Sequence, residues 1–220
     1  METKLVWITP DADQQIAYMA RVSNPKAAPG DPADKLINYL ILHKHWSPFE
    51  MACACVEINT TRDIAHQILR HRSFHFQEFS QRYSEAPEEL VYSDARLQDT
   101  KNRQNSIKLN PDIPEHLAIG GYWDEIQEEQ WEHTWQRYQE ALKLGIAKEL
   151  ARKLLPEGLT RTKMFMNGTI RDWLHYLAVR TGNETQLEHR NVAKSIENIL
   201  AGVCPQVFAA ARSAGLLATD

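Results

Sequence analysis

Apolar residues recur along this chain with two periods, one typical of helices and one typical of short buried strands. Helical spacing predicts helices at residues 11–22, 123–155 and 171–180, one whose apolar side lies within residues 36–41, one or two within residues 184–211, and another that opens at Thr60. Short apolar runs predict strands at residues 5–8, 51–58 and 162–168. The 220 residues suffice for one sizeable domain and are too few for two comfortable ones. We therefore expect a single mixed α/β (α+β) domain over residues 1–220, mostly helical with a small sheet.

Polar residues mark the boundaries between these elements. Thr60 has the character of an N-cap, and Asp63 three residues later completes a start that resembles a capping box. Residues 24–32 form a loop by composition, and residues 93–114, rich in Asn, Gln, Arg and Pro, are expected to form a long surface loop. A loop of that length is uncommon, so we expect it to be functional or partly ordered by a partner.

The composition narrows the class of protein. Hydrophobic residues make up 43% and charged residues 25%, as in ordinary soluble domains. A net charge of −4 excludes a surface that is basic all over, so any anion site is local. The chain has no signal-peptide pattern and no apolar run of the ~20 residues that a membrane helix needs. Cys53, Cys55 and Cys204 fit reduced thiols in a cytoplasmic protein, and their spacing suggests no zinc or other metal site.

The densest chemistry lies in residues 70–84, which combine cations with hydrogen-bonding groups. Arginine presents a planar fork suited to phosphates and to carbonyl-bearing ring edges. If residues 77–83 are extended, Glu78, Ser80 and Arg82 project from one face and alternate residues from the other. The pattern favours an anionic ligand with a polar ring. A solvated charged helix end followed by a polar strand is the plainer alternative.

This string, Arg-His-Arg followed by Ser and an Arg-Tyr pair, resembles the signature of flavin-dependent thymidylate synthases. His75 and Gln77 stand where the family usually carries serine and asparagine, a variant that resembles viral-type relatives. The resemblance extends to residues 45–50, to the segment around Arg152 and to residues 169–180, where Thr169 replaces a frequent asparagine. It covers nearly the whole chain.

The resemblance implies a fold of that type and a reaction, the reductive methylation of dUMP to dTMP. It implies FAD as cofactor, NADPH as reductant and methylenetetrahydrofolate as one-carbon donor. It also implies a cytoplasmic homotetramer, in the host cytoplasm if the chain is viral, with active sites shared between subunits. No G-x-G-x-x-G loop is present, so scattered side chains are expected to hold the flavin.

The same resemblance assigns roles to individual residues. The flavin contacts it implies are Ser47, Glu50, Arg70, His71, Arg72, Glu78, Thr169, Arg171 and His175. The dUMP contacts are Gln67, Arg70, Glu78, Phe79, Ser80, Gln81, Arg82, Arg152 and Arg180. The catalytic residues that it implies are Arg180, Arg70 and Ser80, and Ser80 acts as a ligand contact. It also implies that His45 contacts the folate.

Helical geometry sets a constraint on this assignment. At about 100° per residue, Arg171 and His175 share a helix face while Arg180 points roughly to the other side. One helix serving two subunit-shared sites would explain this, and so would irregularity near Gly182.

Simpler interpretations stay open for single residues: Ser47 as a helix or turn cap, and Arg152 and Arg171 as surface ion-pair partners. Trp131 and Trp135 fit a core or a subunit interface. Three other functions are also considered. One is a flavoenzyme acting on another pyrimidine nucleotide, and another is an inactive flavin-binding subunit. The third is nucleic-acid binding through Arg62, Arg70, Arg72 and Arg82 with Phe74 and Phe76.

Overall fold

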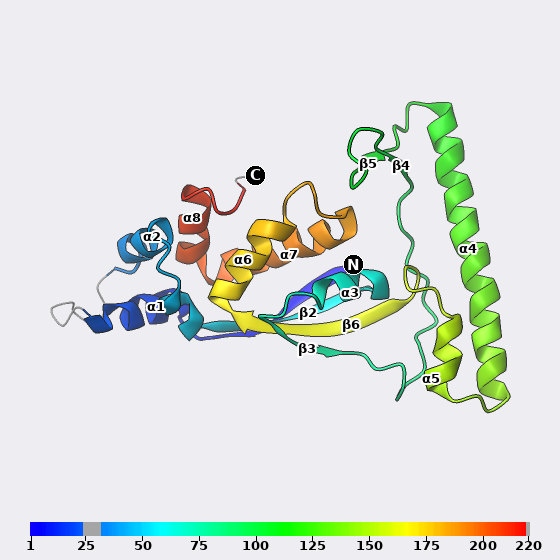
Figure 1. Cartoon of the computed structure of the whole chain (residues 1–220), viewed down its shortest axis with the longest axis horizontal. Helices are drawn as coiled ribbons and strands as arrows, with labels where there is room; N and C mark the ends of the chain where they lie inside the picture. Colours follow the sequence, from blue (N-terminus) through cyan, green and yellow to red (C-terminus); the bar gives the residue numbers. More distant parts are fainter. Residues whose placement is uncertain (24–31, 219–220) are drawn as a thin grey trace. The chain divides into compact units, whose positions relative to one another are not determined.

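The computed structural model describes residues 1–23 and 32–218. Its strands are β1 (Glu2–Ile8), β2 (Cys53–Thr61), β3 (His75–Glu78), β4 (Arg96–Gln98), β5 (Ser106–Lys108) and β6 (Arg161–Thr169). Its helices are α1 (Ala12–Ala20), α2 (Asp34–Leu42), α3 (Arg62–Ile68), α4 (Pro114–Lys143), α5 (Lys148–Ala151), α6 (Ile170–Arg180), α7 (Leu187–Val203) and α8 (Pro205–Ser213). Three short 3₁₀ segments are η1 (Arg21–Ser23), η2 (Ser47–Met51) and η3 (Arg152–Leu154). The predicted class, mixed α/β and mostly helical, is confirmed (Figure 1).

The chain divides into two compact units. The first comprises residues 1–58, 68–77 and 164–220, and the second comprises residues 59–67 and 78–163. The backbone passes from one unit to the other within β2, α3, β3 and β6. The expectation of one domain over the whole chain stays a prediction.

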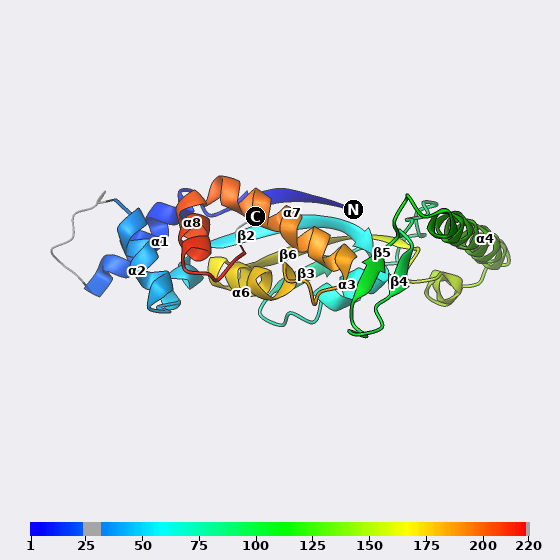
Figure 2. The same cartoon turned by 90° about the horizontal axis from the view of Figure 1, so that it is seen from above.

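The first unit is built on a sheet with strand order β1-β2-β6-β3. Helices α6 and α7 lie over one face of this sheet (Figures 1 and 2), and α7 contacts both β1 and α8. Met164 and Met166 on β6 are fully buried, whereas the residues that alternate with them are partly exposed. Trp173 of α6 is also buried and donates its indole N–H to the Ala54 carbonyl, at 3.1 Å. Apolar burial and one satisfied polar atom thus fix α6 on the sheet.

Asp13 joins α1 to the start of α8. Its carboxylate is buried and accepts hydrogen bonds from the backbone N–H groups of Gln206 (3.0 Å) and Val207 (3.1 Å). The Cys204 thiol donates to the same carboxylate at 2.9 Å. The first N–H groups of a helix have no acceptor within the helix. Here the acceptor is the carboxylate of a residue almost two hundred positions earlier in the chain.

The second unit contains the 30-residue helix α4. Tyr138 of this helix is fully buried with Ala151 and Leu155, and its hydroxyl accepts a hydrogen bond from the Ala86 N–H at 3.0 Å. Trp131 is buried and stacks on Trp135, which packs against this cluster, as one of the two interpretations of these tryptophans expected.

The predicted helix at residues 123–155 is wrong at both ends. Helix α4 begins at Pro114, because proline is well suited to the first turn of a helix, where its missing N–H has no partner to lose. It ends at Lys143, two residues before Gly145, which adopts a φ of 80°. Glycine tolerates this left-handed conformation and commonly terminates helices. The remaining residues form α5 and η3 instead.

Two further boundaries differ from expectation. Strand β2 continues through Thr61, so Thr60 lies in a strand and caps no helix, while the Thr61 hydroxyl donates to Asp63. The predicted loop at residues 93–114 contains the antiparallel β4–β5 hairpin. Asp99 organises the tip of this hairpin by accepting bonds from the N–H groups of residues 101 and 102, at 2.8 and 3.1 Å. The other predicted loop, at residues 24–32, lies outside the described residues apart from Pro32.

Candidate active site

The arginine-rich segment begins where α3 ends, and Phe74 anchors it in the first unit. Phe74 is 5% exposed and packs edge-on against Trp173, with ring centroids 4.7 Å apart. A Cβ atom on Gly168 would lie only 2.5 Å from the Phe74 ring, so the strand comes as close as glycine allows. The arginine-rich turn comprises residues 69–74, between α3 and β3, and its Arg70 and Arg72 are exposed and pair with no described residue. The turn thus presents two uncompensated cations.

His71 and Arg180 meet in the first unit. The Arg180 Nε–H donates to His71 Nε2 at 2.8 Å, which requires that nitrogen to be unprotonated. Burial and the charge of Arg180 lower the pKa of His71 to about 4, so the imidazole is neutral near pH 7. The terminal nitrogens of Arg180 have no partner among residues 1–23 and 32–218. The guanidinium therefore keeps both its charge and donors for a ligand.

The other two predicted residues of α6 contact η2 and the residue that precedes it. Arg171 forms an ion pair with Glu50, and the ring of His175 lies edge-on to Trp46 with centroids 4.8 Å apart. Burial lowers the pKa of His175, and Arg171 lowers it further. Arg171 and His175 thus contact one set of residues and Arg180 contacts another. The helical geometry predicted this, because it placed Arg180 on a different side of the helix from the other two.

Thr169, Ser47 and His45 occupy different local settings. Thr169 is the N-cap of α6 and forms a capping box with Asp172, which also satisfies the Thr169 backbone N–H at 2.9 Å. Ser47 is exposed and begins η2 without making a side-chain cap, so the interpretation of Ser47 as a cap is wrong. His45 is exposed beside Tyr39 and His43.

In the second unit, Glu78 is held by two neighbours. Arg62 forms an ion pair with it at 3.2 Å, and the Thr162 hydroxyl donates to the same carboxylate oxygen at 2.9 Å. Phe79 follows directly, and its backbone N–H donates to the Lys163 carbonyl at 2.8 Å. These contacts leave the other Glu78 oxygen for a further donor.

The extended conformation considered for residues 77–83 is wrong beyond Glu78, where β3 ends. The N–H groups of Tyr83 and Ser84 both donate to the Ser80 carbonyl at 3.1 Å, which makes this stretch a turn. Glu78, Ser80 and Arg82 therefore share no strand face. Gln81 is buried instead, and its side-chain nitrogen has no hydrogen-bond partner among the described residues. Buried amides are rarely left unpaired, so this donor is suited to a ligand.

Two arginines predicted to bind the nucleotide meet at Glu149. Arg82 contacts its carboxylate at 3.5 Å, and Arg152 donates to its backbone carbonyl at 3.4 Å. Both side chains of the Arg82 ion pair are more than half exposed, so the pair is weak and open to competition from a phosphate. Gln67 lies half-buried on α3 in the same unit.

The cysteines offer no activated nucleophile. Burial raises the pKa of Cys53, Cys55 and Cys204, and nearby carboxylates raise it further for the first and last of these. A nucleophilic thiol requires a lowered pKa instead.

In the part of the chain that the structure describes, no three side chains of the metal-binding types lie close together. No helix within residues 1–23 and 32–218 is long and apolar enough to cross a membrane.

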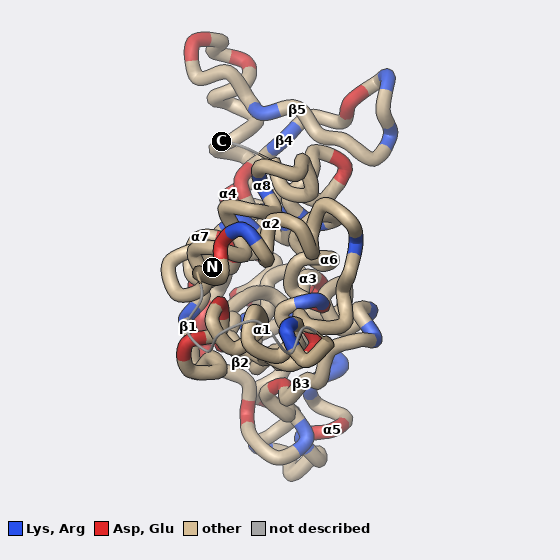
Figure 3. The backbone as a smooth tube through the Cα atoms, turned by 90° about the vertical axis from the view of Figure 1, so that its left-hand side faces the viewer, with Lys and Arg blue, Asp and Glu red and all other residues tan. Residues whose placement is uncertain are grey.

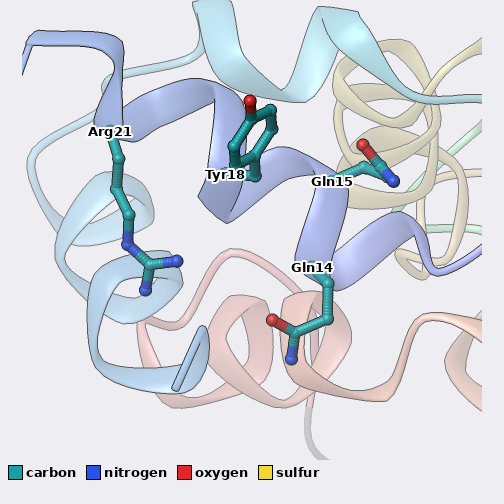
Figure 4. A pocket seen from close by; sticks show the side chains of 4 residues that line it. All are labelled: Gln14, Gln15, Tyr18 and Arg21. Atoms are coloured by element: carbon teal, nitrogen blue, oxygen red, sulfur yellow. The ribbon is translucent and has the colours of Figure 1, made fainter. Parts of the chain in front are cut away.

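Charge and shape add two observations outside this segment. Basic and acidic positions are interspersed along the backbone (Figure 3), which disfavours nucleic-acid binding. A hollow on α1 is lined by Gln14, Gln15, Tyr18 and Arg21 (Figure 4), and none of the predicted site residues lines it.

Sequence reasoning missed Tyr176 and His189, which lie beneath His71. Both are buried, and the Tyr176 hydroxyl and His189 Nε2 are 3.0 Å apart. Tyr176 lies four residues before Arg180 on the same helix, and this spacing could have indicated that the two side chains are neighbours. No pattern in the sequence marks His189.

The chain is similar to known proteins over most of its length. The model of the family described as "Thymidylate synthase complementing protein" matches residues 4–206. A probable flavin-dependent thymidylate synthase of Paramecium bursaria Chlorella virus 1 is 44% identical over 94% of this chain and 97% of its own length. The flavin-dependent thymidylate synthase of Synechocystis is 48% identical over 89% and 87%.

A solved structure shares the fold. The UMP/dUMP methylase PolB from Streptomyces cacaoi, crystallised with 5-Br dUMP, is similar with a TM-score of 0.84 and 25% identity. The likeness covers 99% of this chain and 97% of PolB. With its four-stranded sheet, helical cover and arginine-rich turn, the chain belongs to the family of flavin-dependent thymidylate synthases.

Proposed function

We propose that the chain methylates dUMP to dTMP as a flavin-dependent thymidylate synthase. The observation that carries this proposal is the 44% and 48% identity, over about nine tenths of the chain or more, with relatives of that activity. The reaction joins the methylene carbon of methylenetetrahydrofolate to carbon 5 of the uracil, which loses its proton, and breaks the bonds between that carbon and the folate nitrogens. Reduced flavin, when bound, would supply the hydride that completes the methyl group, NADPH would reduce the oxidised flavin again, and the folate would leave as tetrahydrofolate.

The flavin contacts we propose in the first unit are Ser47, Glu50, Arg70, His71, Arg72, Thr169, Arg171 and His175. The cations of this set suit a dinucleotide: Arg70 and Arg72 are exposed and pair with no described residue, and arginine binds phosphate in two-pronged geometry. The side-chain oxygen of Asn167, two residues before Thr169 on β6, is buried without a partner in the described chain, a second sign that a polar ligand fits here. We propose that Glu78, in the second unit, also contacts the flavin, and that exposed His45 contacts the folate.

Arg180 is the residue that we propose activates the nucleotide. Its uncompensated guanidinium would stabilise negative charge that develops on the uracil ring while the new carbon–carbon bond forms. Neutral His71 would fix the Nε–H of Arg180 without cancelling its charge. Arg70 would add a second cation, and Ser80 would act as a ligand contact.

The remaining dUMP contacts that we propose lie in the second unit: Gln67, Glu78, Phe79, Ser80, Gln81, Arg82 and Arg152. The unpaired amide nitrogen of Gln81 supports a hydrogen bond to the nucleotide. The weak contacts of Arg82 with the Glu149 carboxylate and of Arg152 with the Glu149 carbonyl support a phosphate site, since a dianion attracts both guanidinium groups more strongly than these partners do.

The assembly that we propose is a homotetramer with active sites shared between subunits. Apolar side chains on α4, among them Leu117 (59% exposed) and Tyr122 (66% exposed), support burial against another chain. Light scattering coupled to gel filtration measures the mass, and a monomer at micromolar concentration would contradict this assembly.

A second candidate function, methylation of UMP, has one observation in its favour. The similar structure, PolB, is described as a UMP/dUMP methylase. The signature also carries two unusual residues, His75 and Gln77, which supports a different choice of nucleotide.

One experiment separates these functions. Purified protein is incubated with methylenetetrahydrofolate, NADPH, FAD and either dUMP or UMP, and the nucleotide and folate products are identified by mass. Formation of dTMP and tetrahydrofolate that depends on flavin is the expected result. Methylation of UMP alone would replace the first proposal with the second, and unchanged nucleotides from flavin-loaded protein would contradict both.

A further inference from the structure

Two buried side chains outside the proposed set of ligand contacts lie against His71. Tyr176 of α6 and His189 of α7 are 1% and 0% exposed. Their hydroxyl and Nε2 atoms are 3.0 Å apart. A polar pair costs free energy to bury, so its position beneath a proposed active-site residue calls for a physical explanation.

Both rings of the pair lie nearly perpendicular to the ring of His71. The rings of Tyr176 and His71 meet edge-on at 83°, with centroids 4.8 Å apart, and the ring of His189 lies at 84° to His71, 6.4 Å away. An imidazole lone pair lies in the plane of its ring, so the orientation of His71 determines where Nε2 can accept a hydrogen bond. The position of Arg180 Nε follows from it, because the two nitrogens are bonded at 2.8 Å.

A comparison within α6 shows why a neutral acceptor matters. Arg171 forms an ion pair with Glu50, which compensates its charge. Arg180, on the same helix, is held by a neutral imidazole and keeps its full positive charge. Arg180 also follows Tyr176 by four residues, so the two side chains lie on the same side of the helix.

We propose that Tyr176 and His189 are positioning residues for Arg180, and that they act through the ring of His71 to hold the guanidinium uncompensated and aimed at the nucleotide. This inference rests on the role of Arg180 in the proposed function. It extends that role to two residues that touch neither nucleotide nor flavin.

The first test compares steady-state kinetics of Tyr176→Phe, His189→Phe and His189→Gln. The first two remove the hydrogen bond and keep an aromatic ring. They should lower kcat/KM for dUMP about tenfold, since small displacements of a catalytic group cost one to two orders of magnitude. Flavin content should stay unchanged. His189→Gln retains a hydrogen-bonding group and should recover most of the loss.

Tyr138→Phe is the matched control. Tyr138 is another fully buried tyrosine whose hydroxyl makes one hydrogen bond, to the Ala86 N–H in the core of the second unit. It should lose stability to a similar degree and keep the wild-type kcat/KM. Wild-type kinetics in folded Tyr176→Phe and His189→Phe, or an equal loss in Tyr138→Phe, would overturn the positioning role.

A second measurement needs neither substrate nor flavin. ¹⁵N NMR of histidine-labelled wild-type protein should show His71 near pH 7 as the neutral tautomer with its proton on Nδ1, and Tyr176→Phe should change that signal. A His71 proton on Nε2, or a signal that Tyr176→Phe leaves unaltered, would overturn the inference. If the wild type does not methylate dUMP, the proposed function fails, and this spectrum still decides whether the pair orients His71.

Discussion

Single residues set the shape of the arginine-rich turn. Gly168 lies where a side chain would meet the ring of Phe74, and Phe74 in turn packs against Trp173 and Tyr176. A buried aromatic ring inside a charged segment gives the turn a fixed conformation. The two arginines that precede Phe74 therefore depend on a glycine almost a hundred residues further along the chain.

Gly168→Ala should destabilise the protein by about 1–3 kcal/mol, because a methyl group 2.5 Å from a buried ring forces the ring or the strand to move. Urea unfolding measures the change. Gly158→Ala is the control, since a Cβ atom there meets nothing within 4 Å, and it should alter stability by less than about 0.5 kcal/mol. Equal stability of the two variants would contradict the packing argument.

Arg180→Ala should lower kcat for dTMP formation by about 10²- to 10³-fold, the usual effect of removing one preorganised donor from developing charge. Arg180→Lys should rescue little of it, because a lysine cannot donate to His71 and present two further N–H groups in one plane. Arg190→Ala, which removes an exposed bond to Asn183, serves as the control. Near-normal turnover of Arg180→Ala at saturating dUMP would refute the activation role.

At the scale of elements, the ends of helices are held by partners of two kinds. The capping box of Thr169 and Asp172 is local and starts α6 next to β6. The start of α8 depends instead on Asp13, which belongs to α1. Because α6 carries Arg171, His175 and Arg180, its cap sets the register of three proposed contacts.

Asp13→Ala should cost about 2–4 kcal/mol of stability, because one buried and one part-buried backbone N–H group at the start of α8 lose their acceptor. Differential scanning calorimetry should show the loss as a lower Tm. Asp34→Ala, at an exposed position in the first turn of α2, should cost no more than about 1 kcal/mol. Should both variants melt together with the wild type, the Asp13 bonds would not stabilise α8.

For the whole molecule, two neutral histidines link stability to pH. The pKa of His71 is lowered from 6.5 to about 4 and that of His189 to about 3, in both cases first by burial and then by the charge of Arg180. Below pH 6.5 the unfolded chain therefore binds protons that the folded chain does not. Protonation favours the unfolded state in that range.

The free energy of unfolding should accordingly decrease as pH falls from 6.5 toward 4. His189→Gln removes one of these groups, so its stability should vary less steeply with pH between about 7 and 5 than that of the wild type. Urea titrations at several pH values give both slopes. Parallel slopes would show that His189 does not remain neutral in the folded protein.

Several features of this protein follow from its sequence alone. Apolar periodicity predicted β1, β2, β6 and α6 to within a few residues, because burial against a core requires those periods. The string at residues 70–84 indicated the family, since its chemistry depends on residue types that rarely occur together in that order. The comparisons confirm that family.

Only the tertiary structure decided how the charged groups are partnered. Whether an arginine keeps its charge depends on what lies across from it: Arg171 meets Glu50, whereas Arg180 meets His71. The same holds for Gln81, which the turn after β3 buries with its side-chain nitrogen unpaired among the described residues. His189 and Asp13 act on residues far away in the sequence, and periodicity carries no information about such pairs. Local patterns determine which elements form, whereas desolvation and hydrogen bonding between distant segments determine the chemistry of their side chains.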